Sequence, residues 1–107
     1  ALAQQAKVLL LDEPTSSLDI KHQLEVMDLT QKLVTTQNLT AIIAIHDLNL
    51  SFRYCDQIVM MKNGKIHNTG NPNTVLTPKN IQDVYKVQVI INQNQNIPYI
   101  IPLQATP

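Results

Sequence analysis

The stretch "VLLLDEPTSSLD", residues 8–19, joins a short apolar run to a cluster of carboxylates. The run leads directly into the neighbouring carboxylates Asp12 and Glu13, and Asp19 follows after a proline and a polar turn. Because this stretch contains no Lys or Arg, a buried pair of carboxylates here would need a cation from elsewhere. The stretch therefore predicts a strand that ends at a site for a metal ion.

The segment from Ala6 to Asp12 is predicted to be a strand covered on both faces in a parallel sheet, because its apolar residues do not alternate with polar ones. "TAIIAIH", residues 40–46, repeats this pattern and also ends at an ionisable residue. Residues 20–36 have apolar side chains at helical spacing, in two stripes where a surface helix needs one. Two stripes favour a helix that is wedged between the sheet and another element.

A strand, a helix and a strand in this order form a βαβ unit, in which the strands are parallel and the crossover is right-handed. In such sheets the functional groups gather at the carboxyl ends of the strands. Asp12, Glu13 and His46 each stand at such an end. The sequence thus predicts an α/β fold that brings these three side chains to one candidate site.

The second half of the chain carries clear turn and cap residues. It is predicted to hold, in order, a short helix capped by Asp47 and ending near Tyr54, a hairpin over residues 57–70, a helix begun by Thr77-Pro78 and ending near Lys86, and a hairpin of two short strands over residues 87–102. The pair Asn63-Gly64 supplies the two positive φ angles of a type I′ turn in the first hairpin. Pro98 and Pro102 confine the last strand to an edge.

The chemistry of the candidate site follows from its residue types. A carboxylate at a strand end, Asp12, can hold Mg²⁺ through its waters, and the neighbouring Glu13 can polarise an attacking water. A histidine on the adjacent strand, His46, can donate a hydrogen bond to a phosphate oxygen as charge develops there. Each residue alone also has a structural interpretation, as a turn, cap or packing residue. Together they predict a phosphoryl-transfer site.

Composition narrows the class of protein. The 107 residues allow one domain at most, and the balance of eight acidic and eight basic residues gives no electrostatic reason to expect nucleic acid or an acidic membrane surface. The apolar runs are too short to span a bilayer, and the first residues do not have the pattern of a signal segment. The single Cys55 excludes an internal disulfide and suits a reducing compartment, so the cytoplasm is expected.

"LLLDEPTSSLD" followed by "AIIAIHDL" resembles the second half of an ABC (ATP-binding cassette) transporter ATPase. Residues 8–12 resemble its Walker B strand, Glu13 its catalytic glutamate, residues 17–19 its D-loop and His46 its switch histidine. The resemblance covers at least residues 1–70. It implies a partial P-loop NTPase (RecA-like) fold of the α/β class, with a parallel sheet, flanking helices and C-terminal β-hairpins, and without the Walker A half.

The resemblance also implies a role for each site residue. Asp12 would hold Mg²⁺, Glu13 would activate water and His46 would contact the γ-phosphate of ATP. Asp19, with Ser17 beside it in the D-loop, would communicate across a homodimer that encloses two ATP molecules. Ser17 is a mild departure, because this position is often Ala or Gly in the family. The other implied partner is a membrane permease, which would place the protein on the cytoplasmic face of the membrane.

The chain departs from the family pattern in what it lacks. No G-x-x-x-x-G-K-S/T loop, Q-loop or LSGGQ signature is present. We therefore expect the isolated chain neither to bind ATP tightly nor to hydrolyse it. In the family the Walker A strand lies beside the strand that ends at His46, so its absence would expose the edge of residues 40–46. We expect the isolated chain to self-associate through that edge, or to rearrange its hairpins over it.

The C-terminal tail adds a softer resemblance. Residues 71–107 are expected to be a helix-and-hairpin extension, and "YKVQV" and "IPYIIP" are similar to the tails of ATPases that serve iron–siderophore, haem and cobalamin importers. The leading interpretation is therefore part of an importer's ATPase subunit, with the cargo itself not readable from this chain. The alternatives are part of a soluble ABC ATPase that does not transport, and a non-catalytic module that binds protein.

Overall fold

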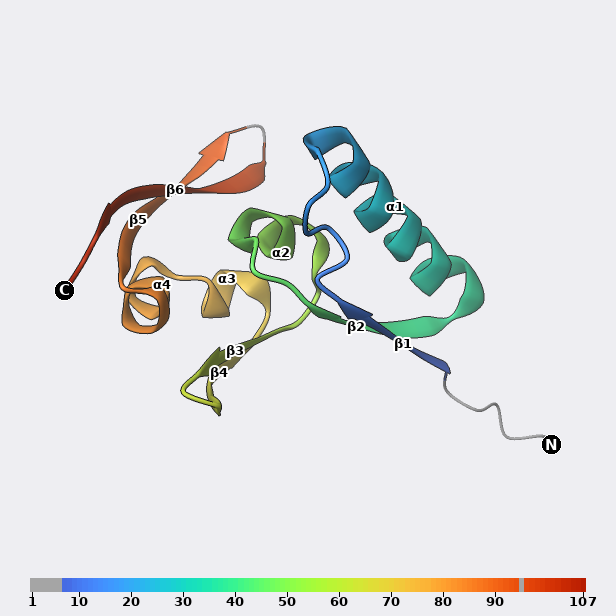
Figure 1. Ribbon diagram of the computed structural model, residues 1–107, viewed down its shortest axis with the longest axis horizontal. Coiled ribbons are helices and arrows are strands. Elements are labelled where there is room, and N and C mark those ends of the chain that lie inside the picture. The colour runs from blue at the N-terminus through green and yellow to red at the C-terminus, as the bar shows by residue number, and fades with distance from the viewer. Residues whose placement is uncertain (1–6, 95) are drawn as a thin grey trace. The chain divides into compact units, whose positions relative to one another are not determined.

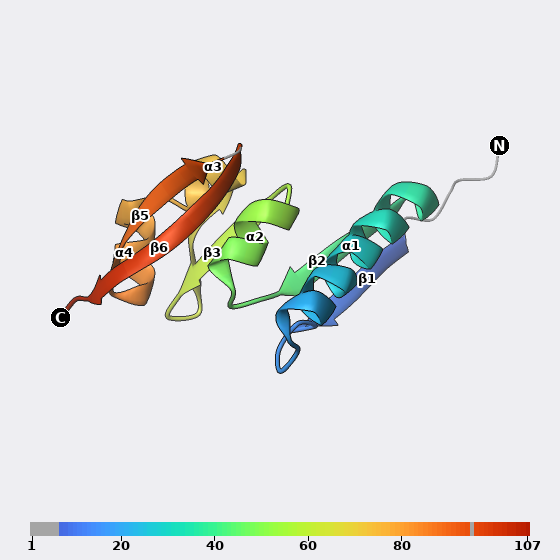
Figure 2. The same cartoon turned by 90° about the horizontal axis from the view of Figure 1, so that it is seen from above.

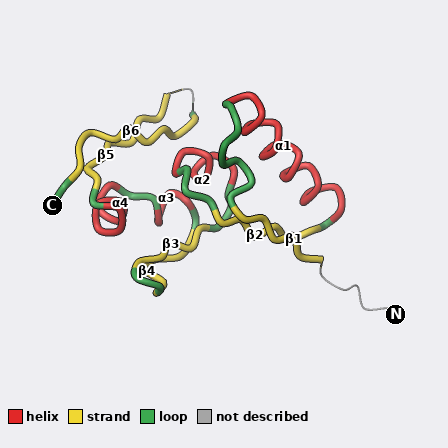
Figure 3. Tube along the Cα trace, in the orientation of Figure 1, coloured by secondary structure: helices red, strands yellow, loops and turns green. Residues whose placement is uncertain are grey.

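The computed structural model describes residues 7–94 and 96–107. The chain forms two compact units, Ala1–His46 and Asp47–Pro107. Figure 1 and Figure 3 show helices and two-stranded sheets in both units. The sequence predicted a different division, into a family-like core over residues 1–70 and a C-terminal extension over residues 71–107. This division stays a prediction.

The first unit is the predicted βαβ arrangement. Strand β1 (Lys7–Asp12) pairs in parallel with β2 (Leu39–Ala44), and helix α1 (Ile20–Gln37) connects them. The register places Asp12 opposite Ala44 at the carboxyl end of the pair. Helix α1 lies along one face of the two strands (Figure 2). The predicted Ala6 lies outside the described residues, and His46 follows the end of β2 instead of lying within it.

The sheet of the first unit is covered on one face. Side chains alternate along β1, so that Leu9 and Leu11 are partly buried while Val8 and Leu10 are exposed, Leu10 to 72%. Ile42, which the register places opposite Leu10, is exposed as well. The prediction of a strand covered on both faces is therefore wrong for the described residues, because α1 supplies cover on one side only.

Helix α1 buries a single face, which includes Met27 of one predicted stripe. Met27 and Thr30 are its buried residues, and the Thr30 hydroxyl donates to the carbonyl of Val26 at 2.8 Å. The two predicted stripes are Ile20, Leu24, Met27 and Val34 on one side and Val26, Leu29 and Leu33 on the other. Ile20 of the first stripe and Leu29 of the second are both exposed, Ile20 to 77%. The prediction of a wedged helix is wrong for the described structure, since the exposed residues of both stripes flank the single packed face.

The second unit holds seven elements: α2 (Leu48–Tyr54), β3 (Ile58–Lys62), β4 (Lys65–Gly70), α3 (Pro72–Val75), α4 (Pro78–Tyr85), β5 (Val87–Asn94) and β6 (Ile97–Ala105). Strands β3 and β4 form one antiparallel hairpin, and β5 and β6 form another. Asn63 and Gly64 turn the first hairpin with φ angles of 53° and 75°, as predicted. The Asp47 and Thr77 caps are also confirmed. Helix α3, which Asn71 caps, was not predicted.

Both hairpins contain a register shift that the sequence did not predict. In β4 the pairing passes from Asn68 to Ile66, so His67 is the extra residue of a bulge. In β6 the pairing passes from Gln104 to Pro102, so Leu103 is extra there. Strand β6 also runs beyond the predicted end at Pro102. A bulge next to Pro102 fits the rule that proline in a sheet lies at an edge or an irregularity.

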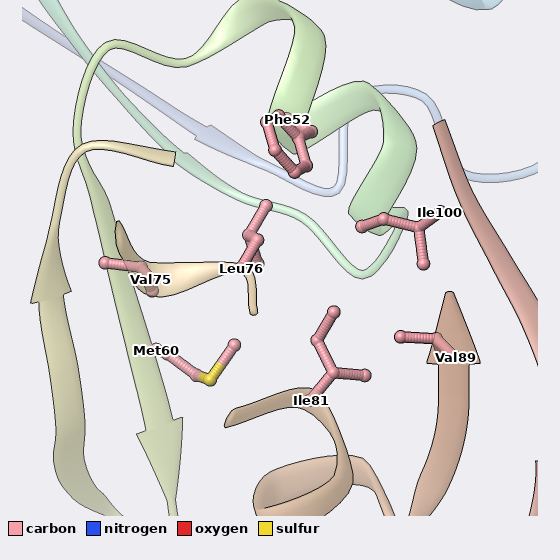
Figure 4. Packing of buried hydrophobic residues seen from close by; sticks show 7 residues of the cluster. All are labelled: Phe52, Met60, Val75, Leu76, Ile81, Val89 and Ile100. Atoms are coloured by element: carbon pink, nitrogen blue, oxygen red, sulfur yellow. The ribbon is translucent and has the colours of Figure 1, made fainter. Parts of the chain in front are cut away.

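The core of the second unit is apolar and continuous (Figure 4). Its buried members come from α2, α3, α4, the loop after α3 and both hairpins: Phe52, Met60, Val75, Leu76, Ile81, Val89 and Ile100. Asn49 of α2 binds the edge of β6, because its amide donates to the carbonyl of Ile100 at 3.2 Å and accepts from the Ile100 N–H at 2.6 Å. Among the residues that the structure describes, no helix has the length and apolarity needed to cross a membrane.

Candidate functional site

The candidate site centres on a contact between Glu13 and His46. Glu13 Oε1 lies 2.6 Å from Nε2 of His46, within hydrogen-bond distance. The parallel pairing of β1 with β2 produces this contact, because the Glu13 N–H donates to the carbonyl of Ala44 at 2.7 Å and extends the pairing past Asp12. His46 stands two residues beyond Ala44 on the neighbouring chain segment. The structure thus brings Glu13 and His46 together at the carboxyl ends of the strands, while Asp12 stands at the end of β1 opposite Ala44.

The backbone at Glu13 is left-handed, with φ at 47°. A residue other than glycine in this region is strained by about 1–2 kcal/mol. The conformation ends β1 and turns the chain into Pro14. The Glu13 side chain reaches His46, which follows the end of the adjacent strand β2.

The carboxylates at the end of β1 are exposed, contrary to the expectation of a buried pair. The Glu13 side chain is 41% exposed, that of His46 is 83% exposed, and Asp12 is exposed as well. Exposure removes the large desolvation penalty, so a bound metal is not needed to explain why the chain tolerates these carboxylates. Glu13 instead has His46 as its partner within the protein.

A magnesium ion fits this site only if a single protein carboxylate holds it, together with waters and the phosphates of a substrate. The described residues include no group of three or more His, Cys, Asp and Glu side chains placed to hold a metal ion. Mg²⁺ commonly uses one or two carboxylates, several waters and the phosphates of a substrate, and not a cage made of protein alone. Asp12, an exposed carboxylate at the strand end, matches the single-carboxylate arrangement.

The two D-loop residues lie in the turn that follows Glu13. The Ser16 N–H donates to the carbonyl of Glu13 at 3.1 Å, and the Leu18 N–H donates to that of Thr15 at 3.2 Å, so the chain makes two successive turns. Ser17, with φ at 67°, is a second left-handed residue in this loop. Asp19 ends the loop as the N-cap of α1. In the described structure neither Ser17 nor Asp19 bonds to Glu13 or His46.

His22 lies beside this loop and is not among the predicted site residues. Its Nδ1 lies 2.7 Å from Oδ1 of Asp19, the same oxygen that accepts the His22 N–H at 2.9 Å. The signal was present in the sequence, because the residue three positions after an N-cap is within reach of the cap side chain. His67, also given no role, has Nε2 at 3.8 Å from Oδ2 of Asp83.

The arrangement can carry out acid–base chemistry on a bound water. A carboxylate that is oriented by a neighbouring imidazole can accept a proton from water, and an exposed imidazole can donate to an anionic oxygen. Both groups are accessible from solvent at the same edge of the sheet. Their chemistry suits attack of water on a phosphate more than nucleophilic catalysis, because no Ser or Cys is bonded to either group in the described part of the chain.

Comparison with curated proteins gives many relatives of one kind. An uncharacterized ABC transporter ATP-binding protein of Methanocaldococcus jannaschii is 44% identical over 103 residues, which is 96% of this chain and 40% of that protein. A cobalamin import ATP-binding protein of Halobacterium salinarum is 44% identical over 85% of this chain and 23% of its own length. A petrobactin import ATP-binding protein of Bacillus anthracis is 42% identical over 94% of this chain and 37% of its own. The chain thus spans less than half the length of each. No protein-family model matches the chain.

Solved structures agree with these relatives. A transporter described as of the metal-chelate ABC type, in an inward-facing conformation, has a TM-score of 0.82 and 25% identity over 92% of this chain and 40% of the solved one. A dimeric ATP-binding cassette in a post-hydrolysis state, bound to ADP and Pi, has a TM-score of 0.57 and 29% identity over 61% of this chain and 28% of its own. The predicted P-loop NTPase fold class is confirmed by these neighbours.

Proposed function

Because this chain belongs to the family of ABC transporter ATP-binding proteins, we propose that it forms the water-activating part of an importer's ATPase subunit. The observation that carries the proposal is the 2.6 Å contact between Glu13 Oε1 and His46 Nε2 at the carboxyl edge of β1 and β2. Glu13 accepts a proton from the attacking water. His46 orients Glu13 through Nε2, and Nδ1 is the ring nitrogen left to donate to the γ-phosphate of ATP, which requires a proton on both ring nitrogens.

Asp12 and the following loop complete this assignment. Asp12 is the residue that would hold Mg²⁺, which supplies positive charge to the phosphates when it is bound. Ser17 and Asp19 face a second ATPase subunit across the nucleotide in the proposed homodimer. Support for the nucleotide and for the dimer comes from the solved neighbour that is dimeric and bound to ADP and Pi.

The cargo and the partners are proposed from the relatives. The names of two relatives give cobalamin and petrobactin as the imported compounds, and a third relative, of Bradyrhizobium diazoefficiens, is a hemin import protein at 40% identity. We assign this chain to the same group, which transports metal chelates of the iron–siderophore, haem or cobalamin type. Its partner is then a membrane permease, and the ATPase lies on the cytoplasmic face of the membrane through that permease.

The chain alone is proposed to be inactive. It carries the groups that act on water but no phosphate-binding loop, whose backbone N–H groups and lysine provide much of the affinity for ATP. A nucleotide titration of the 107 residues should therefore give no saturable binding at micromolar ATP. Binding at micromolar ATP would contradict this part of the proposal.

The test of the proposed function is Glu13→Gln in the full-length protein that carries this sequence. The substitution keeps the shape and the hydrogen bond to His46 but removes the proton acceptor, so ATP hydrolysis should fall by about a hundredfold or more while ATP binding is retained. Glu25→Gln is the matched control, since Glu25 is an exposed residue of α1 that pairs only loosely with Lys21, at 3.8 Å. Equal activity of the two variants would overturn the proposal.

A further inference from the structure

We propose that His22 and Gln23 are positioning residues that hold the loop between Glu13 and Asp19 at two points. The inference rests on the proposed function, because it assigns to these two residues the task of fixing the orientation of Glu13. They are neighbours in the first turns of α1, and each reaches back to a different part of the loop.

The first point of attachment is the Asp19 carboxylate. Its Oδ1 accepts two hydrogen bonds from one residue, from the backbone N–H of His22 at 2.9 Å and from the ring Nδ1 at 2.7 Å. The ring must carry a proton on Nδ1 to make the second bond. The second bond adds to the N-cap bond in holding the Asp19 side chain against the first turn of α1, and so in holding the end of the loop near α1.

The second point of attachment is the carbonyl of Thr15. Gln23 Nε2 donates to this oxygen at 3.4 Å, and the Leu18 N–H donates to the same oxygen at 3.2 Å. Thr15 is 4% exposed, which makes it the most buried residue of the loop. Polar groups of a buried residue need hydrogen-bond partners, and Gln23 supplies one of the two that the described structure gives to this carbonyl.

The loop requires such attachment because its backbone is strained at two residues. Glu13 and Ser17 are both left-handed residues other than glycine, and such conformations persist only where the surroundings enforce them. His46, the partner of Glu13, is 83% exposed and so cannot by itself hold the carboxylate in place through packing. The pairing of β1 with β2 places the Glu13 backbone, through the bond from its N–H to the Ala44 carbonyl, and the loop attached to α1 holds the chain on the other side of Glu13.

A purely structural explanation predicts a different result on substitution. The N-cap of α1 uses the backbone N–H of His22, which remains in every variant, so changes of the side chain leave the cap intact. If the His22 ring bonded Asp19 without influencing the loop, its removal would leave the rate of ATP hydrolysis unchanged. If the ring positions the loop, its removal lowers kcat, while KM for ATP stays the same because neither residue binds nucleotide.

The experiment measures kcat and KM of the full-length protein with His22→Ala, Gln23→Ala and the double substitution. Each single change should lower kcat by about fivefold, the effect of one hydrogen bond, with KM for ATP changed less than about twofold. His22→Asn should restore most of the activity, because the Asn amide places a donor at the position of Nδ1. Gln31→Ala, at an exposed position of α1, is the control and should match the unchanged protein.

Hydrogen exchange separates failure of this inference from failure of the proposed function. The amides of Ser16 and Leu18 should exchange several-fold faster in the double variant, whatever the protein hydrolyses. Unchanged exchange and unchanged kcat, in a protein that Glu13→Gln inactivates, would overturn the positioning role alone. Faster exchange in a protein that Glu13→Gln leaves active would overturn the proposed function and leave the attachment of the loop standing.

Discussion

The carboxylate of Glu13 and the imidazole of His46 meet at 2.6 Å although all of α1 and β2 lies between them in the chain. Their contact depends on the register of a parallel pair of strands, which brings the residues just beyond Asp12 and Ala44 to the same edge. A carboxylate and an imidazole in this position can act on water together, and several consequences can be measured.

Substitution of His46 should impair hydrolysis more than it impairs folding. His46→Ala removes the partner of Glu13 and the donor to phosphate, so we expect kcat of the full-length protein to fall by about a hundredfold or more. Its 83% exposure predicts a small effect on the midpoint of thermal unfolding. His67→Ala, which removes a histidine from the other unit, is the control. A loss of activity equal in the two variants would contradict the role of His46.

Substitution of Asn49 should destabilise the second unit. Asn49→Ala leaves both the N–H and the carbonyl of Ile100 without their partner at a residue that is 3% exposed, so the free energy of unfolding should fall by about 2 kcal/mol. Chemical denaturation measures the change. Asn92→Ala, at an exposed position of the same hairpin, should change the free energy of unfolding by less than about 0.5 kcal/mol.

The two glycines should differ in their tolerance of alanine. At Gly70, with φ at 149°, an added Cβ would lie 2.9 Å from the Thr74 hydroxyl oxygen, which is itself bonded to the carbonyl of Asn71. Gly70→Ala should therefore lower the free energy of unfolding by about 3 kcal/mol. Gly64 has open space around its Cα, so Gly64→Ala should lower it by about 1 kcal/mol through backbone strain alone. Equal losses would show that the Thr74 contact is unimportant.

The thiol of Cys55 should react slowly with alkylating reagents. Burial raises the pKa of Cys55, and the negative charge of Asp56 raises it further. The thiolate fraction at pH 8 is therefore smaller than for an ordinary thiol, and the inflection of the rate of iodoacetamide alkylation should lie above the ordinary pKa. Asp56→Asn should speed alkylation at pH 8, while Asp83→Asn, which removes an equal charge elsewhere in the unit, should not.

The open face and edge of the first unit predict self-association of the isolated chain. Leu10 and Ile42 lie opposite one another on the face that α1 leaves uncovered. Among the strands that the structure describes, β2 pairs with β1 alone, so its other edge is open as well. Light scattering of the 107 residues should give a mass above 12.0 kDa that falls when Leu10 and Ile42 are both changed to Gln. Ile66→Gln, at an exposed apolar site of β4, is the control. A clean monomer would refute the prediction.

Sequence patterns predicted those elements whose ends are marked by single residues. Asp47, Asn63-Gly64 and Thr77-Pro78 each fix a cap or a turn through local chemistry, and the elements that they mark are present. Helix α3 was not predicted, because its four residues are too few to show a periodic pattern. The bulge at His67 was not predicted, because a register shift depends on how two strands twist together, which local sequence does not encode.

The sequence predicted which residues stand at the candidate site, but it did not predict their exposure to solvent. The positions of Asp12, Glu13 and His46 follow from strand ends, which a hydrophobic run reveals. Their exposure does not, since an unbroken apolar run is compatible with cover on one face or on both, and tertiary packing decides between them. The link from His22 to Asp19 likewise depends on side-chain direction at the start of α1, which spacing permits but does not require.

The parallel pairing of β1 with β2 also sets an order of events during synthesis. A hairpin can close as soon as its turn is made, but parallel strands must wait for the connecting helix and for the second strand. Glu13 therefore leaves the ribosome well before His46 exists to meet it, while the apolar residues of β1 are still without a neighbour. Substitutions that slow the docking of α1 should delay formation of the contact between Glu13 and His46. They should also lengthen the period in which a chaperone can bind β1, without altering the chemistry of the folded protein.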